Sequence, residues 1–131
     1  MKIILVDAVN TFIVKDKKGL YKQNTRMYKL LESFKNKKIL VTNADDEQVL
    51  MFGINNSPYD FYTLKHKPDK TNDIYFKKLM KKYGLKAINF LYFDHNKEAV
   101  DVATSLGINS YYYDKNKKDL VGLKYFLERN L

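Results

Sequence analysis

Asp7, Thr42 and Asp94 each stand at the carboxyl end of a short apolar run. If these runs are neighbouring parallel strands, the three side chains converge at one edge of a sheet. Two carboxylates in one place repel each other unless a cation lies between them. Asp7 and Asp94 therefore predict a hard divalent metal ion bound through oxygen, for which Mg²⁺ is the natural choice. The hydroxyl of Thr42, near the start of a helix, can hydrogen-bond a phosphoryl oxygen, and Lys67 can neutralise the charge of that oxygen.

The elements that must position these residues alternate along the chain. Short apolar runs predict strands at residues 3–6, 39–42, 61–64, 88–93 and 110–113. Apolar spacing, capping residues and closing glycines predict helices at residues 25–34, 43–51, 71–83, 97–106 and 118–129. A second apolar stretch, 11–14, precedes a polar turn at 16–19 and predicts a hairpin-like flap after the first strand. This alternation is typical of an α/β protein with a parallel sheet, whose ligands bind beyond the carboxyl ends of the strands.

Length and composition favour one domain over residues 1–131, because a chain of 131 residues with 45% hydrophobic content can build a single core. No apolar run reaches the roughly 18 residues of a membrane span, and the first residues do not resemble a signal peptide. We therefore expect a soluble, cytoplasmic protein. The absence of cysteine excludes disulfides, thiolate metal sites and cysteine nucleophiles.

The net charge of +9 raises the question of a nucleic-acid partner. The sequence has 22 lysines and only 2 arginines, whereas base reading and bidentate phosphate contacts favour the arginine fork. A solvated, lysine-rich surface is thus the preferred interpretation, and nucleic acid is a weakly supported partner. The tyrosines at 111–113 lie in a strand-like run, where aromatic side chains are ordinary packing residues.

Four segments at compatible spacing carry a more specific pattern. They are Ile-Ile-Leu-Val-Asp-Ala-Val-Asn-Thr at 3–11, the run 39–43 ending in Thr-Asn, Lys-Pro-Asp at 67–69, and Leu-Tyr-Phe-Asp at 91–94. Together they resemble the four motifs of the haloacid dehalogenase superfamily over nearly the whole chain. The resemblance implies a Rossmann-like, five-stranded parallel sheet flanked by helices, with a flap hairpin after the first strand and no cap domain.

The resemblance also implies roles for individual residues. Asp7 looks like the nucleophile, and Asp94 like the acid that binds Mg²⁺. The metal would be held by Asp7, Asp94 and the backbone carbonyl of Val9. The substrate phosphate would contact Thr42, Asn43 and Lys67, of which Thr42 and Lys67 also act in catalysis.

Three positions depart from the pattern of the family's phosphatases. The second aspartate of the first motif, which protonates the leaving group and later activates water, is Val9 here. Loss of such a group typically lowers the rate by about 10²- to 10⁴-fold. The glycine before the motif's threonine is Asn10, a residue that tolerates unusual backbone angles. The second acid often found in the fourth motif is His95.

Each candidate also has a simpler structural interpretation. Asp7 and Asp94 can be strand-end acids that are merely solvated, and Thr42 can be a helix cap. Lys67 lies in a lysine-rich segment, where it can be a surface residue and Lys65 is a substitute. Both histidines of the chain, at 66 and 95, are expected to face solvent, and a position bordering the site is the alternative for His95.

These observations favour a slow or specialised Mg²⁺-dependent phosphohydrolase that acts through an aspartyl-phosphate on Asp7. Without an acid at position 9, such an enzyme would prefer leaving groups that need no proton. An open site suits a large phosphorylated substrate or one enclosed by a second copy of the chain. The alternative is a catalytically inactive domain of the same fold that serves as a binding or regulatory module. A third and weaker hypothesis is a basic nucleic-acid-binding protein that uses the fold as a scaffold.

Overall fold

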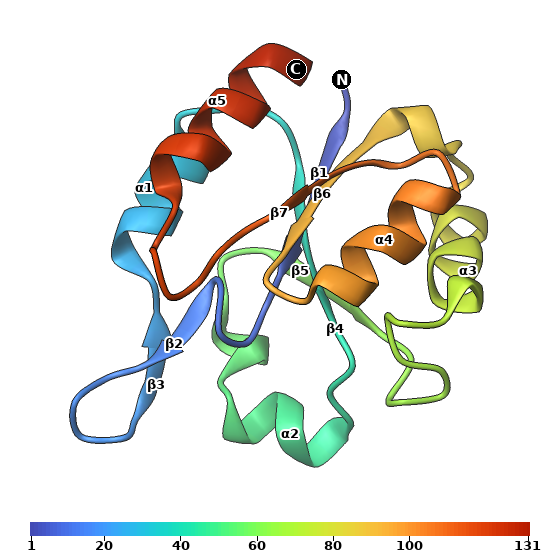
Figure 1. Ribbon diagram of the computed structural model, residues 1–131. Helices are drawn as coiled ribbons and strands as arrows, with labels where there is room; N and C mark the ends of the chain where they lie inside the picture. The colour runs from blue at the N-terminus through green and yellow to red at the C-terminus, as the bar shows by residue number, and fades with distance from the viewer.

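Five parallel strands form the central sheet of the computed structural model, which describes residues 1–131 (Figure 1). The strand order is β5-β4-β1-β6-β7. The strands are β1 Ile3–Asp7, β4 Lys38–Thr42, β5 Asp60–Thr63, β6 Phe90–Asp94 and β7 Asn109–Tyr112. Every neighbouring pair is parallel, so all five carboxyl ends meet at one edge. The predicted α/β, Rossmann-like architecture is confirmed.

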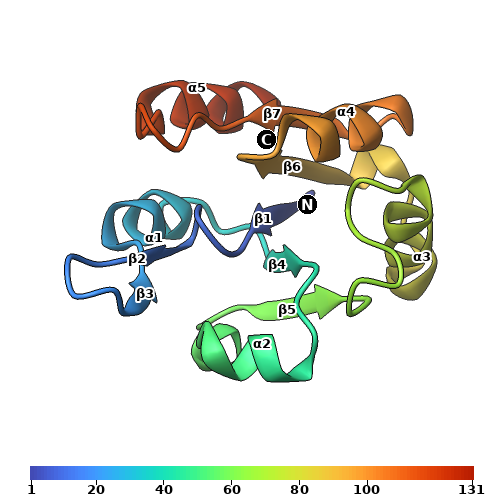
Figure 2. The same cartoon turned by 60° about the horizontal axis from the view of Figure 1, so that its bottom comes forward.

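Helices cover both faces of this sheet (Figure 2). They are α1 Thr25–Glu32, α2 Asp46–Met51, α3 Asp73–Tyr83, α4 Lys97–Ser105 and α5 Leu120–Asn130, with two 3₁₀ helices, η1 Ile54–Asn56 and η2 Ala87–Asn89. Helices α1 and α5 pack on one face, and α3 and α4 on the other. The model contains no helix with the length and apolar character needed to cross a membrane.

The central strand β1 is buried on both faces, as its continuous apolar run requires. Ile4 and Val6 pack with residues of α1 and α5, whereas Leu5 packs with residues of α3 and α4. All three side chains are fully buried. Burial of side chains of this size stabilises the fold by roughly 1.5–3 kcal/mol each. Asp7 therefore sits at the end of a strand that is packed on both faces.

The predicted hairpin follows β1 and consists of β2 Ile13–Lys15 and β3 Tyr21–Gln23, which pair antiparallel. Its turn is held by Asp16 Oδ1, which accepts hydrogen bonds from the backbone N–H groups of Lys18 (2.8 Å) and Leu20 (2.9 Å). The ring of Tyr21 meets Phe52 edge-on, with 4.7 Å between the ring centroids. This contact joins the hairpin to the segment that follows α2.

Four elements begin two or three residues later than the sequence predicts: β6, α2, α3 (expected from 71) and α5 (expected from 118). The strand expected from residue 88 starts at Phe90, because η2 occupies 87–89 and leaves Ile88 71% exposed. The helix expected from residue 43 starts at Asp46, because Asp45 forms a capping box with Gln48. Thr42 consequently ends β4, and Asn43 lies in the loop before α2, outside the helix.

One buried tyrosine links helix α3 to the ends of the strands β4 and β5. The Tyr75 hydroxyl, from α3, accepts a hydrogen bond from the Thr42 N–H (3.1 Å). Its own proton is shared between the carbonyl oxygens of Thr42 (3.0 Å) and Tyr62 (2.8 Å). Tyr75 is fully buried, so no water can replace these contacts. It therefore fixes the ends of β4 and β5 relative to α3.

We expect Tyr75→Phe to lower the free energy of unfolding by about 1–3 kcal/mol, because the Thr42 N–H loses its buried acceptor. Urea denaturation followed by circular dichroism measures this change. Tyr125→Phe is the matched control, since Tyr125 lies on α5 and is 61% exposed. Equal stability of the two variants would show that the Tyr75 hydroxyl does not brace the sheet edge.

Candidate active site

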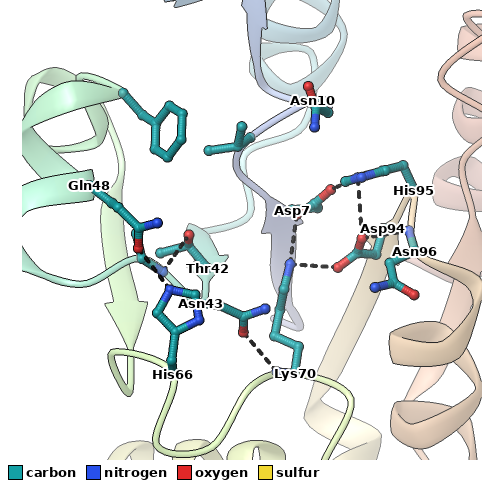
Figure 3. A pocket seen from close by; sticks show the side chains of 13 residues that line it. Asp7, Asn10, Thr42, Asn43, Gln48, His66, Lys70, Asp94, His95 and Asn96 are labelled. Carbon is teal, nitrogen blue, oxygen red and sulfur yellow. Dashed lines mark hydrogen bonds and ion pairs between the residues drawn. The ribbon is translucent and has the colours of Figure 1, made fainter.

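Two carboxylates meet at the carboxyl ends of the neighbouring strands β1 and β6. Asp7 is 2% exposed and Asp94 is fully buried. The Lys70 ammonium lies between them, with Nζ 2.6 Å from Asp7 Oδ1 and 2.7 Å from Asp94 Oδ2 (Figure 3). The sheet edge thus holds a buried ion triad of two acids and one base.

The lysine in this triad is Lys70, whereas Lys67 was predicted from the sequence to be the cation of the site. Lys67 is exposed in the loop between β5 and α3 and makes no ion pair. The substitute, Lys65, is also exposed and pairs with Asp46 at 3.0 Å. The loop takes positive φ at Lys65 and His66, a path that sequence spacing does not reveal.

Asn43 holds the loop in this path. Its Oδ1 accepts a hydrogen bond of 2.7 Å from the backbone N–H of Lys70. The Lys70 side chain then reaches the sheet edge, where Nζ also lies 3.4 Å from the Val41 carbonyl. A buried ammonium is stable only when acceptor groups compensate its charge. In this loop only the lysine at position 70 is buried, and it has these acceptors. Asn43 therefore positions the site lysine in this structure.

The charges of the triad shift one another's protonation. Burial alone would raise the pKa of Asp7, but the Lys70 ammonium and His95 hold it below its usual value. Burial and the neighbouring charge of Asp7 raise the pKa of Asp94 to about 6, against the opposing effect of Lys70. Burial would lower the pKa of Lys70, but the two carboxylates raise it. Asp7 is therefore the more acidic member of the acid pair, and Lys70 stays charged at neutral pH.

The second oxygen of Asp7 has partners of its own. Oδ2 accepts a hydrogen bond of 2.7 Å from the Thr11 hydroxyl and also contacts His95 Nδ1. The hydrogen bond to Asp7 raises the pKa of His95, although burial opposes it. The expectation that His95 faces solvent is wrong, since its side chain is only 23% exposed and points to Asp7.

Thr42 and Asn43 line the same cavity as the triad. Thr42 is 5% exposed, and its Oγ1 accepts a hydrogen bond of 3.2 Å from the Ala44 N–H. No hydrogen bond in the structure uses the proton of the Thr42 hydroxyl. It is therefore available to a negatively charged oxygen in the cavity.

The cavity has a volume of about 290 Å³, and most of its lining residues are polar or charged. Asp7 and Asp94 are the only acids that line it, and Val9 and Phe52 supply apolar wall. His66, expected to face solvent, is exposed at its rim and bonds to Gln48 and Asp69. The arrangement can receive an anion that contacts Lys70 and Thr42 beside an ionised carboxylate.

The donor groups of the cavity fit a divalent metal ion. Asp7, Asp94 and His95 offer ligand atoms within 4.8 Å of one another. The Val9 carbonyl makes no hydrogen bond in the structure, and Val9 lines the cavity. A set of carboxylate and carbonyl oxygens is what hard cations such as Mg²⁺ prefer. The site thus has the chemistry for the metal, with one nitrogen donor close by.

Five contributors to the site were not predicted from the sequence or had no role assigned: Lys70, His95, Thr11, Tyr92 and Tyr75. Tyr92 donates a hydrogen bond to Asp94 Oδ2. This pair was detectable, because residues two apart on a strand face the same side of the sheet. For Lys70 no comparable signal exists, since an irregular loop sets its position.

Comparison with known proteins finds similarity in structure and not in sequence. The chain matches no protein-family model and no curated protein sequence. A HAD family enzyme from Bacteroides thetaiotaomicron, an aspartate-to-alanine mutant in complex with magnesium and inorganic phosphate, superposes with a TM-score of 0.72 at 14% identity. The match covers 94% of this chain and 98% of that one. An uncharacterized protein from Listeria monocytogenes serotype 4b has a TM-score of 0.66 at 13% identity, covering 87% and 79%. The chain therefore adopts the haloacid dehalogenase-like fold.

Proposed function

We propose that the protein is a Mg²⁺-dependent phosphohydrolase that acts through an aspartyl-phosphate on Asp7. The observation that carries this proposal is the buried triad of Asp7, Lys70 and Asp94 at the carboxyl edge of the sheet. Thr42 lines the same cavity and has a free hydroxyl proton. The structural neighbour from Bacteroides thetaiotaomicron was crystallised with magnesium and inorganic phosphate, which supports the same ligands here.

The chain's own residues can supply the nucleophile and part of the charge stabilisation for the first chemical step. The ionised Asp7 carboxylate attacks phosphorus, so a carboxylate oxygen–phosphorus bond forms while the bond from phosphorus to the leaving oxygen breaks. Lys70 and Thr42 stabilise the charge on the phosphoryl oxygens. Water then hydrolyses the acyl phosphate and restores the Asp7 carboxylate.

The metal would be held by Asp7, Asp94 and the Val9 carbonyl. When bound, it supplies positive charge that offsets the repulsion between an anionic substrate and the two carboxylates. Asp94 also depends on Lys70 and Tyr92, which orient its carboxylate. These contacts would keep the Asp94 carboxylate oriented toward the metal.

The missing acid at position 9 narrows the substrate class. No carboxylate other than Asp7 and Asp94 lines the cavity, so no third carboxyl group is at hand to protonate a leaving group, and the His95 imidazole is engaged by Asp7. We propose acyl phosphates or other activated esters, whose leaving groups need no proton, as substrates. A large substrate, or closure by a second copy of the chain, would suit a site without a cap.

A catalytically inactive binding or regulatory module is the second candidate, and one observation favours it. Every oxygen of the two carboxylates already has a partner in the protein. Asp7 uses Lys70, Thr11 and His95. Asp94 uses the Asn96 N–H, Tyr92 and Lys70. The site is thus satisfied internally, as a structural cluster would be.

Mg²⁺ should raise the melting temperature of the wild-type protein, because it binds the folded state selectively. At a concentration of 100 times the dissociation constant the gain is about 2.7 kcal/mol. Asp94→Asn should weaken the effect, since it removes a charged ligand. Thermal denaturation with and without MgCl₂ measures both. Equal stabilisation of the two proteins would argue against the metal site.

Lys70→Met should lower kcat on an activated aryl phosphate by about 10²- to 10³-fold, through loss of charge stabilisation in the transition state. Lys67→Met is the matched control and should keep wild-type activity, because Lys67 is exposed and unpaired. Circular dichroism must show that Lys70→Met is folded. Should folded Lys70→Met retain full activity, or Lys67→Met lose it, the assignment of the lysine is wrong.

Val9→Asp tests the proposed loss of the acid/base group. We expect it to raise turnover of a phosphate monoester with a poor leaving group by about 10²-fold or more, and of an activated aryl phosphate far less. Asp7→Asn should abolish both activities. If wild type and Val9→Asp are equally inert toward all phosphorylated compounds tried, the binding-module candidate replaces the enzyme.

A further inference from the structure

A second cavity, here called the basic cavity, opens beside the candidate active site. It has a volume of about 490 Å³ and lies between the hairpin, the start of α1 and the loop from β7 to α5. Its charged lining residues are Lys15, Arg26, Lys115 and Lys118, and no carboxylate lines it. Asn10 lines both cavities, so the two adjoin at the loop after β1.

The four cations of the basic cavity are not matched by acidic residues in its lining. None of them forms an ion pair, whereas lysines elsewhere on the surface pair with Asp46, Asp73 and Asp101. Like charges around one cavity raise its positive potential and attract anions. One of the four is Arg26, whose planar guanidinium matches phosphate oxygens in pairs.

A nearly buried side chain also has an unbonded hydroxyl here. Tyr113 is only 2% exposed and lines the basic cavity, but its hydroxyl makes no hydrogen bond in the structure. Burial and the nearby carboxylates of Asp119 and Asp114 raise its pKa, so the hydroxyl stays protonated and can donate. No buried polar side-chain atom of the structure lacks a partner, so this unbonded hydroxyl reaches solvent and is open to a ligand in the cavity.

The backbone of the β7–α5 loop also points to a ligand site in the basic cavity. Lys118 has a φ of +48°, a left-handed conformation that lysine seldom adopts. Strained positions of this kind persist where the surrounding structure enforces them, and they gather at ligand sites. Lys118 thus lines the cavity at some cost in backbone energy.

We propose that the substrate carries two phosphate groups, one bound at Asp7 and the other in the basic cavity by Arg26, Lys118 and Tyr113. This rests on the proposed function of the Asp7 site. A small bisphosphorylated compound fits better than a nucleic-acid strand. The cations surround one cavity, and its only aromatic side chain, Tyr113, is too buried to stack on a base.

The test uses a series of linear alkanediols of increasing chain length, each prepared with one terminal phosphate or with two, so that the chain length reports the distance between the two phosphate sites. Binding to Asp7→Asn with Mg²⁺ present is measured by isothermal titration calorimetry, so that turnover does not interfere. We expect the bisphosphate of one chain length to bind on the order of 100-fold more tightly than its monophosphate. No preference at any length would overturn the proposal.

Variants locate the second phosphate. Arg26→Gln combined with Lys118→Gln should remove the preference for the bisphosphate and leave monophosphate binding unchanged. The control combines Lys29→Gln with Lys124→Gln, which removes the same charge from exposed positions on α1 and α5. Equal losses in both double variants would indicate general attraction by net charge and overturn the cavity assignment.

Two further outcomes separate this inference from the proposed function. If wild type hydrolyses the monophosphates but the cavity variants change nothing, only the second phosphate site is wrong. If wild type hydrolyses neither compound but still prefers the bisphosphate, the phosphohydrolase is wrong and the basic cavity stands. Tighter binding of 5′-phosphorylated oligonucleotides with increasing length would overturn the small bisphosphate in favour of nucleic acid.

Discussion

The Lys70 ammonium between Asp7 and Asp94 is the interaction on which the site depends. Three ionisable groups share a volume from which water is almost excluded, and each would be unstable there alone. The acids end two neighbouring strands, while the base arrives from a loop on the far side of β4. The requirement for charge balance thus joins parts of the chain that are more than sixty residues apart.

The sheet and the positions of its acids could be predicted because they follow from local pattern. The continuous apolar run of β1 could only be a strand buried on both faces, and its first charged residue, Asp7, had to mark the edge. The same argument placed Thr42 and Asp94. Asn10 was expected to accept an unusual backbone angle and has a φ of +72°.

The parts that could not be predicted depend on irregular backbone. Lys67 and Lys70 are equivalent by composition, and only the turn at Lys65 and His66 decides which one is buried. His95 is held at the site by its hydrogen bond to Asp7, which spans 88 residues of sequence, and by its contact with Thr11. Ile88 has the residue type of a strand but lies in η2, because the turn before β6 takes precedence over propensity.

Through its contact with Phe52, Tyr21 influences the shape of the cavity without being one of the residues that line it. Phe52 is part of the cavity wall, whereas Tyr21 lies behind it on the hairpin and does not line the cavity. The size of the side chain at position 21 determines how closely the hairpin approaches the segment after α2. Evolution can therefore reshape the entrance by substitutions at Tyr21, while all 13 lining residues stay the same. Homologues that share an identical set of site residues would then differ in the size of molecule they admit.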